Sequence, residues 1–280
     1  MSVAEFRSLR ELVVEKTGIA LGLENRATIE RKLRERVVAT GLTTFGEYVR
    51  FLRFGAGATA EWDEAIDRLT TNETYFFREA HALRALTEEV LPEILPRARS
   101  RGRLAVWSAG CSTGEEAYSI AIALDEADPR PPFDVRVHGS DLARRCVAEA
   151  RRGVYGPSAF RATRPETRRR YFVDKPDGAH VVDSIKARCH FGQTNLVNED
   201  KVRLVGRQDL IFCRNVLIYL DPHARKRVID LFLERLYPGG VLFLGHSESL
   251  LNVSTAFELL HLREELAYRK PSRDLGQMGR

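Results

Sequence analysis

Two glycines and two glutamates stand close together in the segment Gly110–Glu116, directly after the apolar run Leu104–Ser108. This order is typical of a strand that turns into a helix. Glycines let a ligand approach the backbone closely, and the helix N-terminus offers free N–H groups to an anion. The glycine spacing is G-x-x-x-G rather than the dinucleotide-binding G-x-G-x-x-G, and the carboxylates after the second glycine would repel a pyrophosphate. We therefore expect a ligand with hydroxyl groups or positive charge; the structural alternative is a plain turn capped by Ser112 or Thr113.

An acidic residue, Asp141, ends the next apolar run, Val135–Ser140. A carboxylate at the carboxyl end of the second strand of an open α/β sheet is placed to accept hydrogen bonds from ribose hydroxyls. The same residue would also serve as the N-cap of the helix predicted over residues 142–151. The position alone does not decide between the two roles.

Three polar side chains, Arg214, Asn215 and Tyr219, follow a further apolar run, Leu210–Cys213. Residues at the carboxyl ends of parallel strands face the crevice in which open α/β sheets bind ligands. A buried guanidinium without an acidic partner is costly. Arg214 is therefore expected to contact a ligand, with a structural salt bridge as the alternative.

The segment Thr70–Glu79 is dense in side-chain hydrogen-bond donors, including Asn72, Thr74 and Arg78, and it contains the aromatic patch Tyr75–Phe77. Such a segment is either a loop that faces a substrate or an interdomain linker whose aromatic residues are packing anchors. Both interpretations fit the residue types.

These four segments need a scaffold, and the predicted elements supply an α/β fold. Residues 1–69 show apolar residues at helical spacings of three and four, which predicts an all-helical N-terminal domain. Residues 70–275 alternate strands with helices, which indicates a doubly wound, Rossmann-like parallel sheet covered on both faces. Residues 276–280 are predicted to be a tail.

One stretch, about residues 155–194, interrupts this alternation. It contains strand-like pieces around Val181 and Cys189, and we predict a small inserted antiparallel β subdomain. Between Arg144 and Arg188 there are twelve Lys or Arg against five Asp or Glu. A basic surface there would attract an acidic partner, a nucleic acid or an anionic lipid.

Composition excludes several classes of protein. No uncharged apolar tract reaches the roughly 18 residues that a membrane helix needs, and the charges within Met1–Arg10 exclude a secretory signal, so a cytoplasmic location is expected. The four cysteines are widely spaced, without a C-x-x-C pair, which predicts buried thiols and no metal site.

The chain resembles the chemotaxis receptor methyltransferases, the CheR family of protein-glutamate O-methyltransferases, over nearly its whole length. Six motifs of that family stand here in the same order. They are T-T-N-x-T-x-F-F-R-E at 70–79, S-A-G-C-S-T-G-E-E at 108–116, S-D at 140–141, N-L at 195–196, F-C-R-N-V-L-I-Y at 212–219 and G-H-S-E at 245–248.

The resemblance implies a fold with a class I methyltransferase sheet and a donor, S-adenosylmethionine, whose product is S-adenosylhomocysteine. Asp141 or Glu116 would bind the ribose and Asn195 would lie by the adenine, while Arg78 and Tyr219 would lie near the transferred methyl group. The implied cofactor-binding residues are Asn72, Thr74, Arg78, Gly110, Glu116, Asp141, Asn195, Leu196, Arg214 and Asn215. No metal is implied.

The implied partner is the cytoplasmic helical region of a methyl-accepting chemotaxis receptor, and the protein would meet the membrane only through it. A basic helix over residues 26–40 would help to hold the receptor, with Arg31 and Arg34 projecting together, although an ordinary solvated helix fits the same charges. Some relatives grip a receptor tether peptide through a glycine-rich loop of the inserted subdomain. The corresponding loop here, Val173–Gly178, is short and has one glycine, so we expect no dependence on a tether.

Three rival interpretations remain. Gly245–Ser249 nearly matches the G-x-S-x-G nucleophile elbow of α/β hydrolases but lacks its last glycine. An NAD-dependent oxidoreductase is disfavoured by the glycine spacing. A non-enzymatic methyltransferase-like scaffold would bind nucleic acid or protein through its basic surface; if the chain is an enzyme, no nucleic acid partner is expected.

Overall fold

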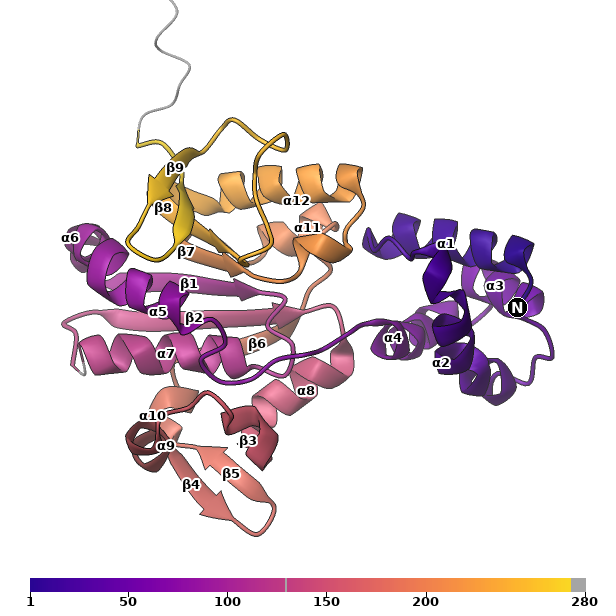
Figure 1. The fold of residues 1–280 in the computed structure, drawn as a ribbon, viewed down its shortest axis with the longest axis horizontal. Helices are drawn as coiled ribbons and strands as arrows, with labels where there is room; N and C mark the ends of the chain where they lie inside the picture. The colour runs from indigo at the N-terminus through magenta and orange to yellow at the C-terminus, as the bar shows by residue number, and fades with distance from the viewer. Residues whose placement is uncertain (129, 273–280) are drawn as a thin grey trace, which may run out of the picture.

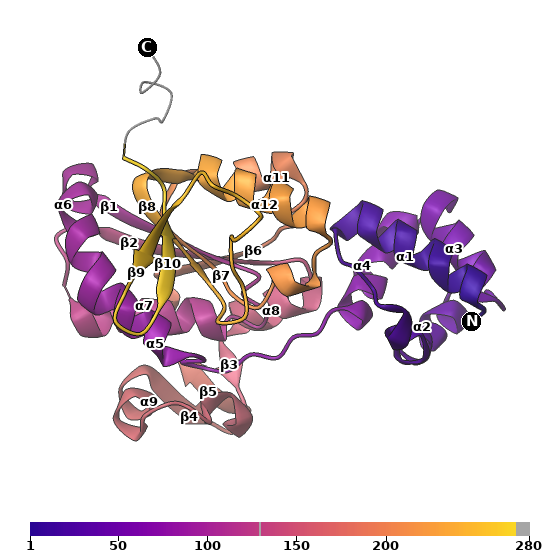
Figure 2. The same cartoon turned by 45° about the horizontal axis from the view of Figure 1, so that its top comes forward.

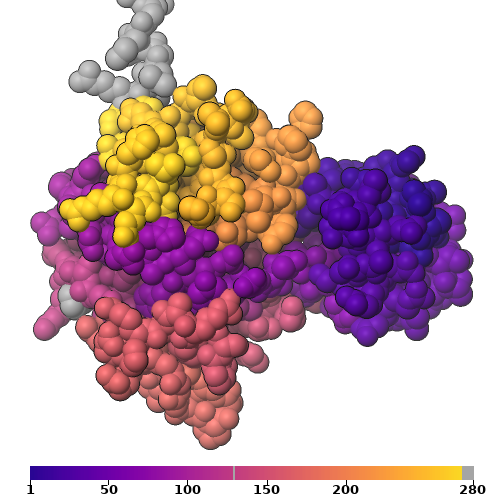
Figure 3. All heavy atoms as spheres, viewed as in Figure 1, coloured from indigo at the N-terminus to yellow at the C-terminus, as the bar shows by residue number. Residues whose placement is uncertain are grey.

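Residues 1–128 and 130–272 are described by the computed structural model, which contains a helical N-terminal unit, a sheet domain and a small subdomain (Figure 1). The predicted tail, residues 276–280, lies outside the described residues. In the space-filling view the N-terminal unit and the subdomain project from different sides of the sheet domain (Figure 3).

The N-terminal unit is a cluster of four α-helices joined by short turns. They are α1 (Val3–Thr17), α2 (Arg26–Ala39), α3 (Phe45–Phe54) and α4 (Ala58–Leu69). Capping boxes begin α1 and α3, where Ser2 and Thr44 each accept a hydrogen bond from the backbone three residues later. Leu9, Leu33 and Tyr48 are fully buried in the core of this unit, because apolar residues at helical spacing place one face of each helix inward.

The sheet domain has the predicted doubly wound architecture. Its seven strands run in the order β6-β2-β1-β7-β8-β10-β9. The first five pair in parallel, and β10 is antiparallel to both β8 and β9. The strands are β1 (Arg103–Ala109), β2 (Asp134–Asp141), β6 (Cys189–Gln193), β7 (Gln208–Cys213), β8 (Leu236–Leu244), β9 (Glu258–His261) and β10 (Leu266–Arg269).

Helices cover both faces of this sheet. Alternate residues of β1 supply the two cores: Val106 packs with α6 and α7, and Trp107 packs with α12. The helices are α5 (Ala80–Ala85), a π-helical turn (Leu86–Val90), α6 (Leu91–Arg101), α7 (Glu115–Ala127), α8 (Arg144–Arg152), α11 (Glu199–Arg203) and α12 (Pro222–Arg235). Among the described residues no helix is both long and apolar enough to cross a bilayer.

The subdomain has a three-stranded antiparallel sheet in the order β3-β5-β4. It contains β3 (Val154–Tyr155), α9 (Pro165–Tyr171), β4 (Phe172–Lys175), β5 (Gly178–Val181) and α10 (Asp183–Lys186). The assignment of the Cys189 strand to this subdomain was wrong, because β6 pairs with β2 in the main sheet, with Cys189 opposite Val137. A short strand carries no local signal of which sheet it joins, so sequence alone misplaced it.

Candidate functional site

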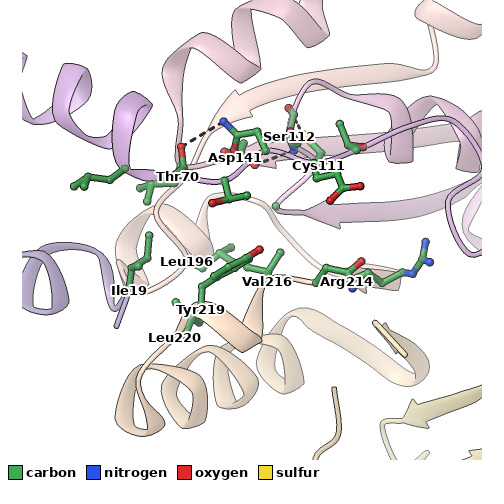
Figure 4. Close-up of a pocket in the computed structure, with 18 of the residues that line it drawn as sticks. Ile19, Thr70, Cys111, Ser112, Asp141, Leu196, Arg214, Val216, Tyr219 and Leu220 are labelled. Carbon is green, nitrogen blue, oxygen red and sulfur yellow. Dashed lines mark hydrogen bonds between the residues drawn. The ribbon is translucent and has the colours of Figure 1, made fainter. Parts of the chain in front are cut away.

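A cavity of about 410 Å³ lies at the carboxyl edge of the parallel strands, beside the N-terminal unit. Figure 4 shows Asp141 and Ser112 on one side of it and Leu196, Val216 and Tyr219 on the other. Every residue that the sequence assigned to the cofactor or to catalysis lines this cavity. They are Asn72, Thr74, Arg78, Gly110, Glu116, Asp141, Asn195, Leu196, Arg214, Asn215 and Tyr219.

The glycine turn after β1 is fixed by backbone contacts. Gly110 has φ +84°, a conformation that favours glycine, and a Cβ atom there would lie 2.3 Å from Cγ2 of Val216. The N–H groups of Gly110 and Cys111 both donate to the Ser140 carbonyl, at 2.7 and 2.9 Å. Gly114 is the N-cap of α7 and no side chain caps that helix, so the alternative of a turn capped by Ser112 or Thr113 was wrong.

Asp141 holds two turns together. Its Oδ2 accepts a hydrogen bond from Ser112 N at 2.8 Å, and its Oδ1 accepts one from Ala143 N at 2.9 Å. Burial raises the pKa of Asp141, and these backbone bonds oppose the rise. The carboxylate therefore shapes the glycine turn and the entry to α8, and it lines the cavity at the same time.

Arg214 sits at the centre of a buried ion cluster. Its side chain is 3% exposed and pairs with Glu79 at 2.7 Å and with Glu116 at 3.3 Å. Its Nη2 also donates to the Arg78 carbonyl at 3.0 Å. The structural salt bridge, the alternative role for Arg214, is present, and Arg214 also lines the cavity.

The two acids of this cluster respond differently to their surroundings. Burial raises the pKa of Glu116, which Arg214 and the Ser108 hydroxyl, 2.6 Å from Glu116 Oε1, partly offset. Partial burial acts in the same direction on Glu79, but pairing with Arg214 outweighs it and lowers the pKa of Glu79. Both carboxylates therefore pair with Arg214, and Glu116 also accepts a hydrogen bond from Ser108.

A glutamate that the sequence interpretation left without a role, Glu248, fixes the loop after β7. Its carboxylate accepts hydrogen bonds from the backbone N–H groups of Asn215, Val216, Ile218 and Gly245 at 2.8–3.2 Å. This accounts for the G-H-S-E motif without a nucleophilic serine. The motif is visible in the sequence, but the loop that Glu248 contacts lies some thirty residues away, and only the fold brings the two together.

The N-terminal unit forms one wall of the cavity, which the sequence interpretation missed. Lys32 on α2 lines it together with Thr17 and Ile19. Asn195 Nδ2 donates to the Lys16 carbonyl at 2.7 Å, and Ala20 N donates to the Tyr219 carbonyl at 2.8 Å. By contrast, Arg31 and Arg34 are on the exposed side of α2, where Arg34 pairs with Glu30, and they do not line the cavity.

Comparisons with known proteins agree with this geometry. Residues 4–70 match the family described as "CheR methyltransferase, all-alpha domain", and residues 72–266 match "CheR methyltransferase, SAM binding domain". "Chemotaxis protein methyltransferase 2" of Vibrio cholerae is 38% identical over 269 residues, which are 95% of this chain and 93% of the relative.

Two further relatives bear the name "Chemotaxis protein methyltransferase". The protein of Klebsiella aerogenes is 37% identical over 96% of this chain and 90% of its own length. The protein of Salmonella typhimurium is 37% identical over 92% of this chain and 88% of its own length. The chain therefore belongs to the CheR family and is an S-adenosylmethionine-dependent methyltransferase of chemotaxis.

Proposed function

We propose that this enzyme methylates glutamate side chains of methyl-accepting chemotaxis receptors, forming glutamate methyl esters in sensory adaptation. The observation that carries the proposal is the division of charge in the pocket. Its acidic groups are engaged by other protein groups. Lys32 also lines the cavity, and its ammonium forms no hydrogen bond or ion pair with any described residue. A free cation beside occupied anions suits an incoming carboxylate.

The pocket also fits a nucleophile that needs no base. A glutamate carboxylate has an ordinary pKa of about 4.3 and is already ionised at neutral pH. None of the described lining residues is a histidine. The three lining carboxylates, Glu73, Glu116 and Asp141, are paired with backbone, hydroxyl or guanidinium donors. An amine or a hydroxyl substrate would have to lose a proton, and the pocket offers no free base for that step.

The donor fits the same cavity. A volume of about 410 Å³ lies in the range of small-molecule sites. Carboxylates at the end of β2 and at the start of α7, Asp141 and Glu116, disfavour a phosphate and favour a cationic nucleoside. We propose that Asp141 or Glu116 binds the ribose and Asn195 lies by the adenine, with the remaining contacts from Asn72, Thr74, Gly110, Leu196, Arg214 and Asn215.

Catalysis is then a matter of alignment. The chemistry supplied by the bound donor is a methyl group on a positively charged sulfur, and its transfer forms an oxygen–carbon bond as the carbon–sulfur bond breaks, without moving a proton. Arg78 and Tyr219 would orient the incoming carboxylate along that line, and the walls of the pocket would exclude water. Tyr219 is 41% exposed, so a side chain entering from outside can reach it.

The proposed partner is a helical receptor segment that carries glutamates. Lys32 would meet the substrate carboxylate, and Arg31 and Arg34 would contact flanking acidic residues. The proposal of no tether dependence is supported by the turn between β4 and β5, where only two residues separate Lys175 from Gly178. We propose a cytoplasmic location, contact with the membrane only through the receptor, and no nucleic acid partner.

Transfer of radiolabelled methyl from the donor to a co-purified receptor tests the proposal. The label should be released by mild alkali, because carboxyl methyl esters hydrolyse readily whereas methylated amines do not. Replacing the receptor's acceptor glutamates by alanine should remove the label. Alkali-stable label, or label on the alanine receptor, would disprove a glutamate ester.

A further inference from the structure

Residues 70–79, here called the strap, run between α4 and α5 (Figures 1 and 2). Three of them, Asn72, Thr74 and Arg78, line the pocket. The two ends of the strap are well held. Thr70 donates through Oγ1 to the Ile66 carbonyl at 3.0 Å, and Phe77 N donates to Ser119 Oγ at 2.9 Å. The pocket-lining middle of the strap lies between these anchors.

One arginine of the inserted subdomain, Arg161, holds that middle part. Its Nη2 pairs with Glu73 Oε1 at 3.0 Å, and its guanidinium carbon lies 3.7 Å from the centre of the Tyr75 ring. Among residues 1–128 and 130–272, no other side chain from outside the strap forms a hydrogen bond, ion pair or ring contact with residues 71–75. Among the described residues, the Arg161 side chain alone therefore holds the middle of the strap from outside, through Glu73 and Tyr75.

Arg161 is itself fixed relative to the strap by an aromatic anchor. Phe76 is fully buried, and its ring centre lies 4.8 Å from those of Tyr155 and Phe172 in the subdomain. Its N–H donates to the Ala159 carbonyl at 2.9 Å, two residues before Arg161. The subdomain thus meets the strap at a defined register.

The contact continues to the pocket through Glu73. Arg78 Nη1 donates to the Glu73 carbonyl at 2.6 Å. Glu73 therefore binds Arg161 through its side chain and Arg78 through its backbone. We propose that Arg161 is a positioning residue for methyl transfer, which orders the strap and thereby places Asn72, Thr74 and Arg78 against the donor. This inference rests on the proposed assignment of these strap residues to the donor site.

The contacts of Arg161 with Glu73 and Tyr75 are weak, so we expect them to affect the order of the strap and not the stability of the whole protein. Arg161 is 47% exposed and Glu73 is 69% exposed, and exposed ion pairs add little to global stability. A cation–π contact adds a similarly small amount. Together they suffice to bias the order of a short segment, which would change donor affinity by about three- to tenfold without unfolding the protein.

The test compares Arg161→Gln with Arg164→Gln in the full chain. Arg164 is a matched control, because it is an exposed arginine of the same subdomain that pairs with Glu126 of α7 and with Glu166, and it does not touch the strap. Calorimetry with S-adenosylhomocysteine should show about three- to tenfold weaker binding for Arg161→Gln only. The KM for the donor should rise in parallel, while the KM for the receptor and the melting midpoint stay at wild-type values.

Two further variants separate positioning from a general loss of structure. Arg161→Lys keeps the charge toward Glu73 and should recover part of the affinity. Adding Glu73→Gln to Arg161→Gln should cost less than the sum of the two single changes, since both break one contact. Equal affinities for Arg161→Gln and Arg164→Gln, or full additivity, would overturn the proposal.

The outcome is distinguishable from failure of the proposed function. Binding of S-adenosylhomocysteine is measured without a receptor, so Arg161 is tested even if receptor glutamates prove not to be the substrate. If the wild-type protein binds S-adenosylhomocysteine and Arg161→Gln binds it equally well, the inference about Arg161 fails alone.

Discussion

Arg78 illustrates how one side chain is prepared for chemistry by its neighbours. Its Nη1 is bound to the Glu73 carbonyl, and its own carbonyl accepts from Arg214. Both backbone and guanidinium are thereby directed by groups that line the same pocket. Positioning of this kind lowers the barrier of a displacement reaction, in which small misplacements of the reacting atoms are costly.

We expect Arg78→Ala to reduce the rate of methyl transfer about 10- to 100-fold at saturating donor and receptor. Arg78→Lys should lie between this variant and the wild type, because it keeps the charge and loses the planar fork. Single-turnover transfer of labelled methyl measures the effect. Wild-type transfer by Arg78→Ala under these conditions would remove Arg78 from the proposed catalytic group.

Glu248 is expected to matter for stability more than for chemistry. Glu248→Gln replaces a charged acceptor of four backbone N–H groups by a neutral one, and we expect a loss of about 2–3 kcal/mol in the free energy of unfolding. Urea unfolding measures it. Glu258→Gln, at an exposed position of β9, is the control, and equal unfolding midpoints for the two variants would contradict the role given to Glu248.

At the scale of elements, the sequence predicts what depends on local pattern. Buried apolar runs such as Leu210–Cys213 identified the parallel strands, and polar residues at their carboxyl ends identified the pocket. The strand β6 was assigned to the wrong sheet, and the hairpin β9–β10 was not anticipated, because pairing of short, partly exposed strands depends on distant partners. Lys32 was missed as a pocket residue for the same reason: its neighbours across the cavity belong to another domain.

Helix α3 offers a test of local capping. Glu47 accepts hydrogen bonds from the backbone N–H groups of Thr43 and Thr44 at 3.0 and 2.9 Å, and these bonds with the threonine hydroxyls lower the pKa of Glu47 to about 2. A carboxylate whose pKa is lower in the folded state stabilises the fold fully above its unfolded pKa, and this contribution disappears as the pH falls through the folded pKa.

The stability difference between wild type and Glu47→Gln should therefore be largest at neutral pH. It should shrink between the ordinary value of 4.5 and about 2. Denaturant unfolding at several pH values across this window measures the difference. A difference that stays constant down to the lower limit would show that the capping bonds do not depend on the charge.

At the scale of the whole molecule, the pocket belongs to two units rather than one. Backbone bonds cross between them: Ala20 N donates to the Tyr219 carbonyl, and Asp221 N donates to the Gly18 carbonyl at 2.9 Å. Ile19 also forms a β-bridge with Leu220. The segment after α1 and the segment around Tyr219 therefore lie side by side in the cavity wall. A ligand in the cavity contacts both the helical unit and the sheet domain.

Binding of S-adenosylhomocysteine should consequently stabilise both units together. At about one hundred times its Kd, a ligand that binds only the folded state adds about 2.7 kcal/mol, which for a chain of this size raises the melting midpoint by about 5–10 °C. Hydrogen exchange should slow at the backbone amides of Ala20 and Asp221 alike, because each amide crosses the junction that the ligand closes. Slower exchange at Asp221 with no change at Ala20 would mean that the helical unit moves independently of the occupied pocket, and the two-unit site would then be wrong even if the ligand binds.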